Sequence, residues 1–135
     1  MSSKGRPFRR KTVDGFSILI GKGDVENDIL TFEVAGPEDF WLHVVDYAGS
    51  HVIIQNPDHL DVNDIPNNTL RRAGELSAWH SKARGRRGKV EVHVCKAMDV
   101  SKPDGFPPGK VTLTHWSRIM VYARDPSSEE GDQDS

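Results

Sequence analysis

Residues 39–54 read DFWLHVVDYAGSHVII, and this stretch carries the signal of a β-hairpin. Two runs rich in β-branched and aromatic residues, Trp41–Val45 and His51–Ile54, flank a short segment that contains Gly49. Such runs on either side of a glycine-containing turn are typical of paired antiparallel strands. The stretch therefore predicts two neighbouring strands joined by a tight turn.

The length of the turn decides which side chains share a face of this hairpin. A three-residue loop, Tyr47–Gly49, has glycine at the left-handed position and pairs Val45 with His51. A four-residue loop would pair Val45 with Ser50 and send the two histidines to opposite faces, because a one-residue slip inverts every side chain. We favour the first register on its turn chemistry. The residues that then share one face are Trp41, His43 and His51.

The rest of the chain alternates between strand and helix patterns. The further predicted strands are Phe16–Ile20, Val90–Val94, Val111–Leu113 and Ile119–Tyr122. A short helix is predicted from Asp24, and a longer one, capped by Asn68 or Thr69, is expected to end near Gly85. The order of elements predicts an α+β fold, with a mostly antiparallel sheet and two helices packed on one face.

Composition predicts one domain between two polar ends. The chain has 135 residues, and residues 125–135 hold five of its 20 acids and none of its 18 lysines and arginines. We expect a flexible basic arm over 1–11, a folded domain over 12–124 and a disordered acidic tail over 125–135. With a single cysteine, Cys95, and no signal-peptide or membrane-spanning pattern, the cytoplasm is the expected compartment.

A second basic cluster lies within the predicted domain, in the segment SKARGRRGK at residues 81–89. Cations suit the end of a helix, where the dipole is negative, but five within eight residues exceed what capping requires. Its cations are Lys82, Arg84, Arg86, Arg87 and Lys89. Clusters of this kind are typical of contacts with nucleic-acid phosphates.

Catalytic and metal-binding readings of the hairpin are weaker. Ser50 and His51 are adjacent, so they point to opposite faces of a strand, and no G-x-S-x-G elbow surrounds Ser50. His43, His51, His93 and Cys95 do not have the spacing of a complete metal-ligand set. We therefore predict no hydrolase triad and no metal.

The segment Gly21–Asp24 reads GKGD and resembles half of a phosphate loop. It matches neither nucleotide-binding fingerprint, so no cofactor is predicted. A weaker role remains, in which one nucleic-acid phosphate lies beside Lys22.

Several motifs in order resemble one known family. They are GFSILIG (15–21), NDILT (27–31), DFWLH (39–43), GSHVII (49–54), SKAR (81–84), SKP (101–103) and PGKV (108–111). Together they closely resemble the NFACT-R domain, the RNA-binding module of the NFACT family, in its stand-alone form. The resemblance implies an α+β domain that binds RNA and has no established catalytic chemistry. Residues 92–95 depart from the pattern that the family shows.

The resemblance also implies a set of functional residues. Six of them, which we call the signature residues, form the expected functional face: Asn27, Asp28, Trp41, His43, Ser50 and His51. Lys82 and Arg84 are expected to contact the RNA backbone. The implied partner is tRNA or rRNA, including the RNA of the large ribosomal subunit, in translation, ribosome quality control or RNA modification.

Three hypotheses of function remain open from the sequence. The first is an RNA-binding module in which the cations of 82–89 hold phosphates while Trp41, His43 and His51 contact bases or sugars. The second is an RNA-acting enzyme with His43 or His51 as general acid or base. The third is an adaptor that docks on a ribosome through protein contacts. The sequence leaves the oligomeric state open.

Overall fold

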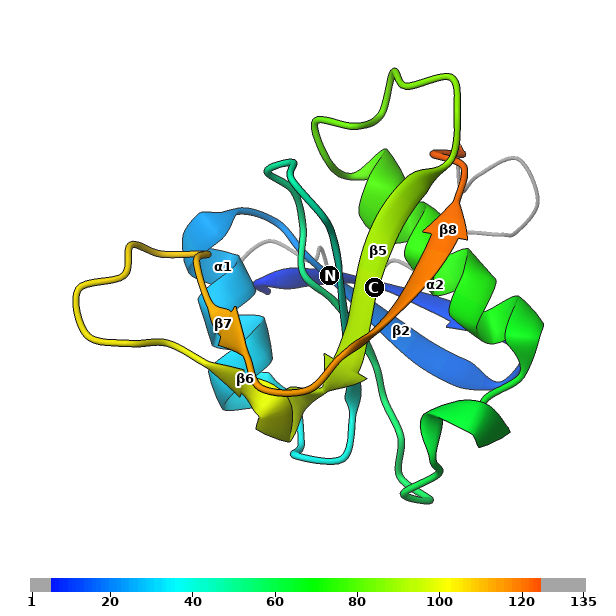
Figure 1. The fold of residues 1–135 in the computed structure, drawn as a ribbon. Helices are drawn as coiled ribbons and strands as arrows, with labels where there is room; N and C mark the ends of the chain where they lie inside the picture. Colours follow the sequence, from blue (N-terminus) through cyan, green and yellow to red (C-terminus); the bar gives the residue numbers. More distant parts are fainter. Residues whose placement is uncertain (1–5, 125–135) are drawn as a thin grey trace.

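The computed structural model describes residues 6–124, and its main element is a six-stranded sheet (Figure 1). The strands follow the order β1-β2-β4-β3-β5-β8, and each neighbouring pair is antiparallel. Their bounds are Phe8–Val13 (β1), Phe16–Gly21 (β2), Phe40–Val44 (β3), Val52–Ile54 (β4), Val90–Lys96 (β5) and Ser117–Val121 (β8). A separate small sheet pairs β6 (Val100–Ser101) with β7 (Thr112–Leu113). The predicted α+β class with a mostly antiparallel sheet is confirmed.

Within the described part of the chain, two α-helices accompany the sheet. The short α1 (Asp24–Ile29) continues into a π-helical turn, η1 (Leu30–Val34), and the longer α2 spans Asn67–Trp79. Two 3-10 turns complete the set, η2 (Val62–Asp64) and η3 (Ala97–Asp99). The predicted end of α2 near Gly85 is wrong, because the chain leaves the helix at His80. The carbonyl of His80 accepts a hydrogen bond from the Ser50 amide at 2.9 Å, which ties the helix end to the hairpin.

The helices cover opposite faces of the sheet. Ile18 and Ile20 pack into the core that contains Leu76 of α2, whereas the intervening Leu19 packs with Leu30 of η1. Figure 1 shows α1 and α2 on the two sides of the sheet. The expectation that both helices pack on one face is therefore wrong. Their placement follows from central strands whose apolar runs are continuous, since a strand buried on both faces does not alternate.

The sheet begins earlier in the chain than the sequence predicted. All six residues of β1 pair with β2, from Phe8 opposite Gly21 to Val13 opposite Phe16. Within β1, the side chains of Lys11 and Val13 are buried. The expectation that residues 8–11 belong to a flexible arm is wrong, because basic residues suit an edge strand as well as a tail. Residues 1–5 of that arm, and the predicted tail 125–135, lie outside the described residues.

The register of the β3–β4 hairpin is shifted by two residues from the predicted one. Leu42 pairs with Val52, which sets His43 opposite His51, so the predicted pairing of Val45 with His51 is wrong. A two-residue shift keeps each side chain on its face, because the period of a strand is two. The predicted clustering of the two histidines on one face therefore survives the wrong register.

The turn of this hairpin uses its residues differently from the prediction. Asp46, with a φ of 70°, is the residue in the left-handed region, and Gly49 is not. Gly49 instead forms a β-bridge with Ser81, and a Cβ on Gly49 would lie 2.4 Å from the Ser81 Cβ. Glycine is therefore needed there for a close approach of two backbones.

Candidate nucleic-acid interface

His51 is the most constrained of the signature residues. Its Nδ1 lies 2.8 Å from Thr31 Oγ1 and its Nε2 lies 3.2 Å from the Gly109 carbonyl oxygen. A carbonyl only accepts, so Nε2 carries the proton and Nδ1 accepts from the threonine hydroxyl. Burial and the neighbouring His43 lower the pKa of His51 to about 3. This histidine is therefore a neutral structural group that joins η1 to the 101–110 loop.

Asn27 links α1 to the hairpin turn. Its Nδ2 donates to the Gly49 carbonyl at 3.2 Å, and its Oδ1 accepts from the His51 amide at 3.0 Å. The side chain is buried, and a Cβ on Gly21 would lie 2.0 Å from Asn27 Oδ1. The asparagine thus satisfies the free backbone groups of the turn and sets its distance from α1.

The side chains of Asp28 and Ser50, like that of Asn27, form hydrogen bonds to the backbone of neighbouring segments. Asp28 Oδ1 accepts from the Gly109 amide at 3.1 Å, and Asp28 Oδ2 lies 3.4 Å from the Lys102 Nζ. Ser50 Oγ donates to the Gly21 carbonyl at 2.6 Å. Both signature side chains therefore hold neighbouring loops in place.

The three signature aromatic rings form one cluster, as the sequence predicted. The centroids of Trp41 and His43 lie 5.9 Å apart with stacked rings, and those of His43 and His51 lie 5.3 Å apart edge to face. Trp41 is only 3% exposed and His51 only 1%, and burial lowers the pKa of the half-buried His43. Bases cannot stack on Trp41 or His51 in this fold, so the predicted contact is corrected for these two residues. Leu30 of η1 and Val111 pack in the cluster of Trp41, and the Gly109 carbonyl bonds to His51. The sequence did not place these segments on this face.

The hairpin turn also pairs with the segment that follows α2. The Ser50 amide donates to the His80 carbonyl at 2.9 Å, and the Lys82 amide donates to the Ala48 carbonyl at 2.8 Å. These bonds flank the bridge between Gly49 and Ser81. They bring Ser50 of the hairpin beside the first cation of the basic cluster.

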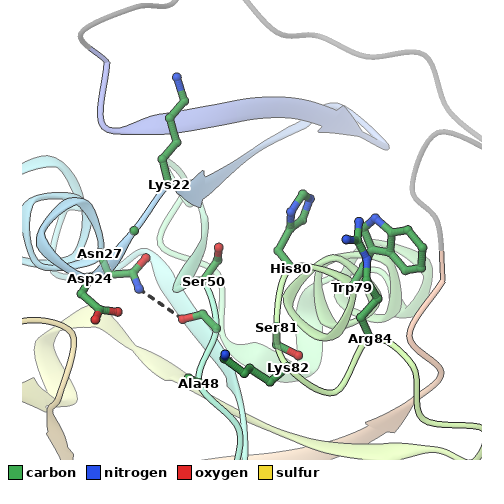
Figure 2. A pocket seen from close by; sticks show the side chains of 12 residues that line it. Lys22, Asp24, Asn27, Ala48, Ser50, Trp79, His80, Ser81, Lys82 and Arg84 are labelled. Carbon is green, nitrogen blue, oxygen red and sulfur yellow. Dashed lines mark hydrogen bonds between the residues drawn. The ribbon is translucent and has the colours of Figure 1, made fainter.

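An open cavity of about 510 Å³ lies at this junction (Figure 2). Its walls come from the β2–α1 loop, the hairpin turn and the end of α2, with Lys22, Ser50, Lys82 and Arg84 among the lining side chains. Figure 2 shows Lys82 extending toward the hairpin turn. Four predicted residues therefore meet around one space, together with the Lys22 of the GKGD segment: Asn27, Ser50, Lys82 and Arg84.

Two lining residues were not expected to be functional. Trp79 and His80 line the cavity, and the Arg84 Cζ lies 4.0 Å from the centroid of the Trp79 ring. From the sequence, the spacing of Trp79 from Leu76 fits the apolar side of the helix, so no functional role is expected for this ring. Only the end of α2 at Trp79 turns this ring toward the basic segment.

The other predicted cations lie beyond the cavity. Arg86, Arg87 and Lys89 are exposed in the loop that runs from α2 to β5. Arg86 lies over the Tyr47 ring at 6.0 Å, and Lys89 lies over the Tyr122 ring at 5.6 Å. We call residues 82–89 the basic loop. It extends the positive charge from the cavity across the adjoining surface.

Neither a metal site nor a membrane span is found among residues 6–124. In that range no three His, Cys, Asp or Glu side chains gather as a metal ion would require. None of the helices there has the length and apolar character of a membrane span.

Fold and site together define a class, a small α+β domain with a cation-lined cavity between a hairpin turn and the end of a helix. Residues 6–115 match the family model of the NFACT protein RNA binding domain. The chain belongs to this family, as the motifs predicted.

Relatives of this chain are much longer proteins. The Rqc2 homolog RqcH of Streptococcus suis is 41% identical over 117 residues, which cover 86% of this chain and 20% of the relative. Ribosome quality control complex subunit 2 of Saccharomyces cerevisiae is 33% identical over 92 residues, covering 68% of this chain and 8% of the relative. This chain therefore spans a fifth or less of the length of these two relatives.

A solved structure supports the fold. The C-terminal part of the fibronectin/fibrinogen-binding protein from Streptococcus suis superposes with a TM-score of 0.78 at 36% identity. The match covers 89% of this chain and 46% of that one.

Proposed function

We propose that this domain binds RNA in ribosome-associated quality control in the cytoplasm, with tRNA or rRNA, including the RNA of the large ribosomal subunit, as its partner. Membership of the NFACT RNA-binding family is the observation that carries the proposal. The names of the longer relatives supply the quality-control context. The cavity and the basic loop supply a surface that suits a polyanion.

The chemistry of that surface favours phosphate contacts over a catalytic role. Exposed lysine and arginine side chains bind phosphate oxygens without a fixed geometry of the bases. By contrast, both ring nitrogens of His51 are engaged and its pKa of about 3 keeps it neutral near pH 7. His51 is therefore unsuited to the acid–base role that the enzyme hypothesis gave it.

The test is the salt dependence of RNA affinity. We expect the logarithm of the affinity for tRNA to fall linearly with the logarithm of salt concentration, because phosphate binding releases counterions. Replacing Arg86→Ala together with Arg87→Ala should weaken binding at low salt. It should also reduce the slope by about 1 to 2, since each phosphate contact contributes about 0.7 to 0.9.

A matched control removes two exposed cations elsewhere, Lys110→Ala together with Arg118→Ala. Neither residue lines the cavity or lies in the basic loop. The control should change the slope much less than the loop variant does. The proposal fails if the unaltered protein binds no RNA at low salt, or if both double variants weaken binding equally.

A further inference from the structure

The cavity is held open by bonds that do not involve its charged side chains. The Gly49–Ser81 bridge fixes the hairpin turn against the end of α2, and Asn27 fixes the same turn against α1. Its volume of about 510 Å³ lies within the ~300–1,000 Å³ typical of small-ligand sites. Such a preformed space suits a group that inserts into it. The surface of a regular duplex offers no group of this kind.

The charges that line the cavity favour an anion. Among residues 6–124, three cations line it, Lys22, Lys82 and Arg84, against a single carboxylate, Asp24. They come from two separate segments, the β2–α1 loop and the basic loop. A phosphate between these segments is therefore approached by positive charge from both sides.

Arg84 adds a planar surface to the same wall. Its guanidinium lies over the Trp79 ring at 4.0 Å, and both residues line the cavity. A guanidinium fixed on an aromatic ring is a platform on which an unpaired base can stack. Stacking of this kind needs a base that has left its duplex.

Ser50 presents an acceptor to the cavity. Its hydroxyl proton is used in the 2.6 Å bond to the Gly21 carbonyl, so the oxygen offers only its lone pairs to a ligand. The 2′-hydroxyl of ribose is a donor that matches this oxygen, and deoxyribose lacks it. Ser50 therefore gives the site a means to distinguish RNA from DNA.

We propose that this cavity holds one unpaired ribonucleotide of the bound RNA. Its phosphate lies among Lys22, Lys82 and Arg84, its base stacks on Arg84, and its 2′-hydroxyl donates to Ser50. This assignment rests on the proposed RNA-binding function and specifies the kind of RNA, a single-stranded or looped segment.

The first test compares single-stranded RNA with duplex RNA. The affinities of a short single-stranded RNA and of a duplex of the same length are measured for the unaltered protein, Lys22→Ala and the control Arg118→Ala. Arg118 is exposed on β8, with 71% of its side chain accessible, and does not line the cavity. We expect Lys22→Ala to weaken single-strand binding about 5- to 10-fold, because one charge-assisted contact with a phosphate is lost. Its effect on duplex binding should match that of the control.

The second test concerns the sugar. The unaltered protein should bind the RNA oligonucleotide several-fold more tightly than DNA or 2′-O-methyl RNA of the same sequence. Ser50→Ala should remove this preference, measured as the ratio of RNA to DNA affinity. Circular dichroism confirms that each variant is folded before affinities are compared.

The outcomes separate the two proposals. If the unaltered protein binds no RNA, the RNA-binding function itself is wrong. If it binds RNA but Lys22→Ala weakens duplex and single strand equally, the cavity proposal is overturned while the function stands. A sugar preference that survives in Ser50→Ala overturns the role of Ser50.

Discussion

The two faces of the central sheet are built from different chemistry. On the α2 face, side chains such as Phe40 and Leu76 belong to a large aliphatic and aromatic core. On the α1 face, a smaller apolar cluster around Trp41 adjoins the buried polar groups of Asn27 and His51. Apolar burial is proportional to area and non-directional, whereas hydrogen bonds fix positions. The α2 face therefore supplies most of the stability, and the α1 face positions the loops that line the cavity.

The largest loss of stability is expected for a variant that disrupts the core on the α2 face. Phe40→Ala removes a fully buried ring and should destabilise the protein by about 3–5 kcal/mol. The exposed Met120→Ala is the control and should change stability by no more than about 0.5 kcal/mol. Urea unfolding followed by circular dichroism measures both. A loss below 1 kcal/mol for Phe40→Ala would contradict the assignment of stability to this face.

A smaller loss is expected on the α1 face, accompanied by a loss of function. Asn27→Ala leaves the His51 amide and the Gly49 carbonyl without their side-chain partner, at about 2–4 kcal/mol for the two groups. RNA affinity should also fall, because the hairpin turn loses its attachment to α1. Asn68→Ala, which removes an exposed bond to Asp14, should leave affinity unchanged. Equal RNA affinities for Asn27→Ala and Asn68→Ala would show that the bonds of Asn27 are not needed to shape the cavity.

A third change tests the close approach at the cavity wall. Gly49→Ala places a Cβ 2.4 Å from the Ser81 Cβ, and relieving that clash should cost about 1–3 kcal/mol and displace the turn. Gly88→Ala in the basic loop meets no atom within 4 Å and serves as the matched control. Thermal unfolding and RNA titration should show losses only for Gly49→Ala. Unaltered RNA binding by Gly49→Ala would argue against the turn as a wall of the site.

The smallest expected effect, taken over a single pH unit, is the change of stability with pH. The folded-state pKa of His51 is about 3, below the usual 6.5, so the unfolded chain binds the extra proton first as pH falls. Stability from this group is therefore complete above about pH 6.5 and declines toward pH 3, by at most about 1.4 kcal/mol per pH unit. The slope between pH 6 and 4 should diminish in His51→Gln. It should remain in His115→Gln, since the His115 side chain is 87% exposed. Identical slopes for the two variants would count against a buried neutral His51.

The hairpin shows what the local sequence pattern can and cannot predict. The alternation around Trp41 and His43 predicted correctly which residues share a face, although the predicted pairing of Val45 was wrong. The predicted and observed registers differ by two residues, so every side chain keeps its face in both. The pattern of side chains therefore cannot distinguish the two registers. In the structure Gly49 pairs with Ser81, which lies far from it in the sequence, and a local pattern does not record such a contact.

By itself, the sequence determined the α+β class, the RNA-binding family and the segments that carry positive charge. The class and the charged segments follow from local periodicity and composition, which are properties of neighbouring residues, whereas the family follows from the resemblance of the ordered motifs. The tertiary structure alone decided that the helices cover opposite faces and that Trp41 and His51 are buried. It also brought Lys22 to the same cavity as Lys82. Such juxtapositions depend on contacts between distant segments, and a motif does not record whether its polar groups bind a ligand or the chain's own backbone.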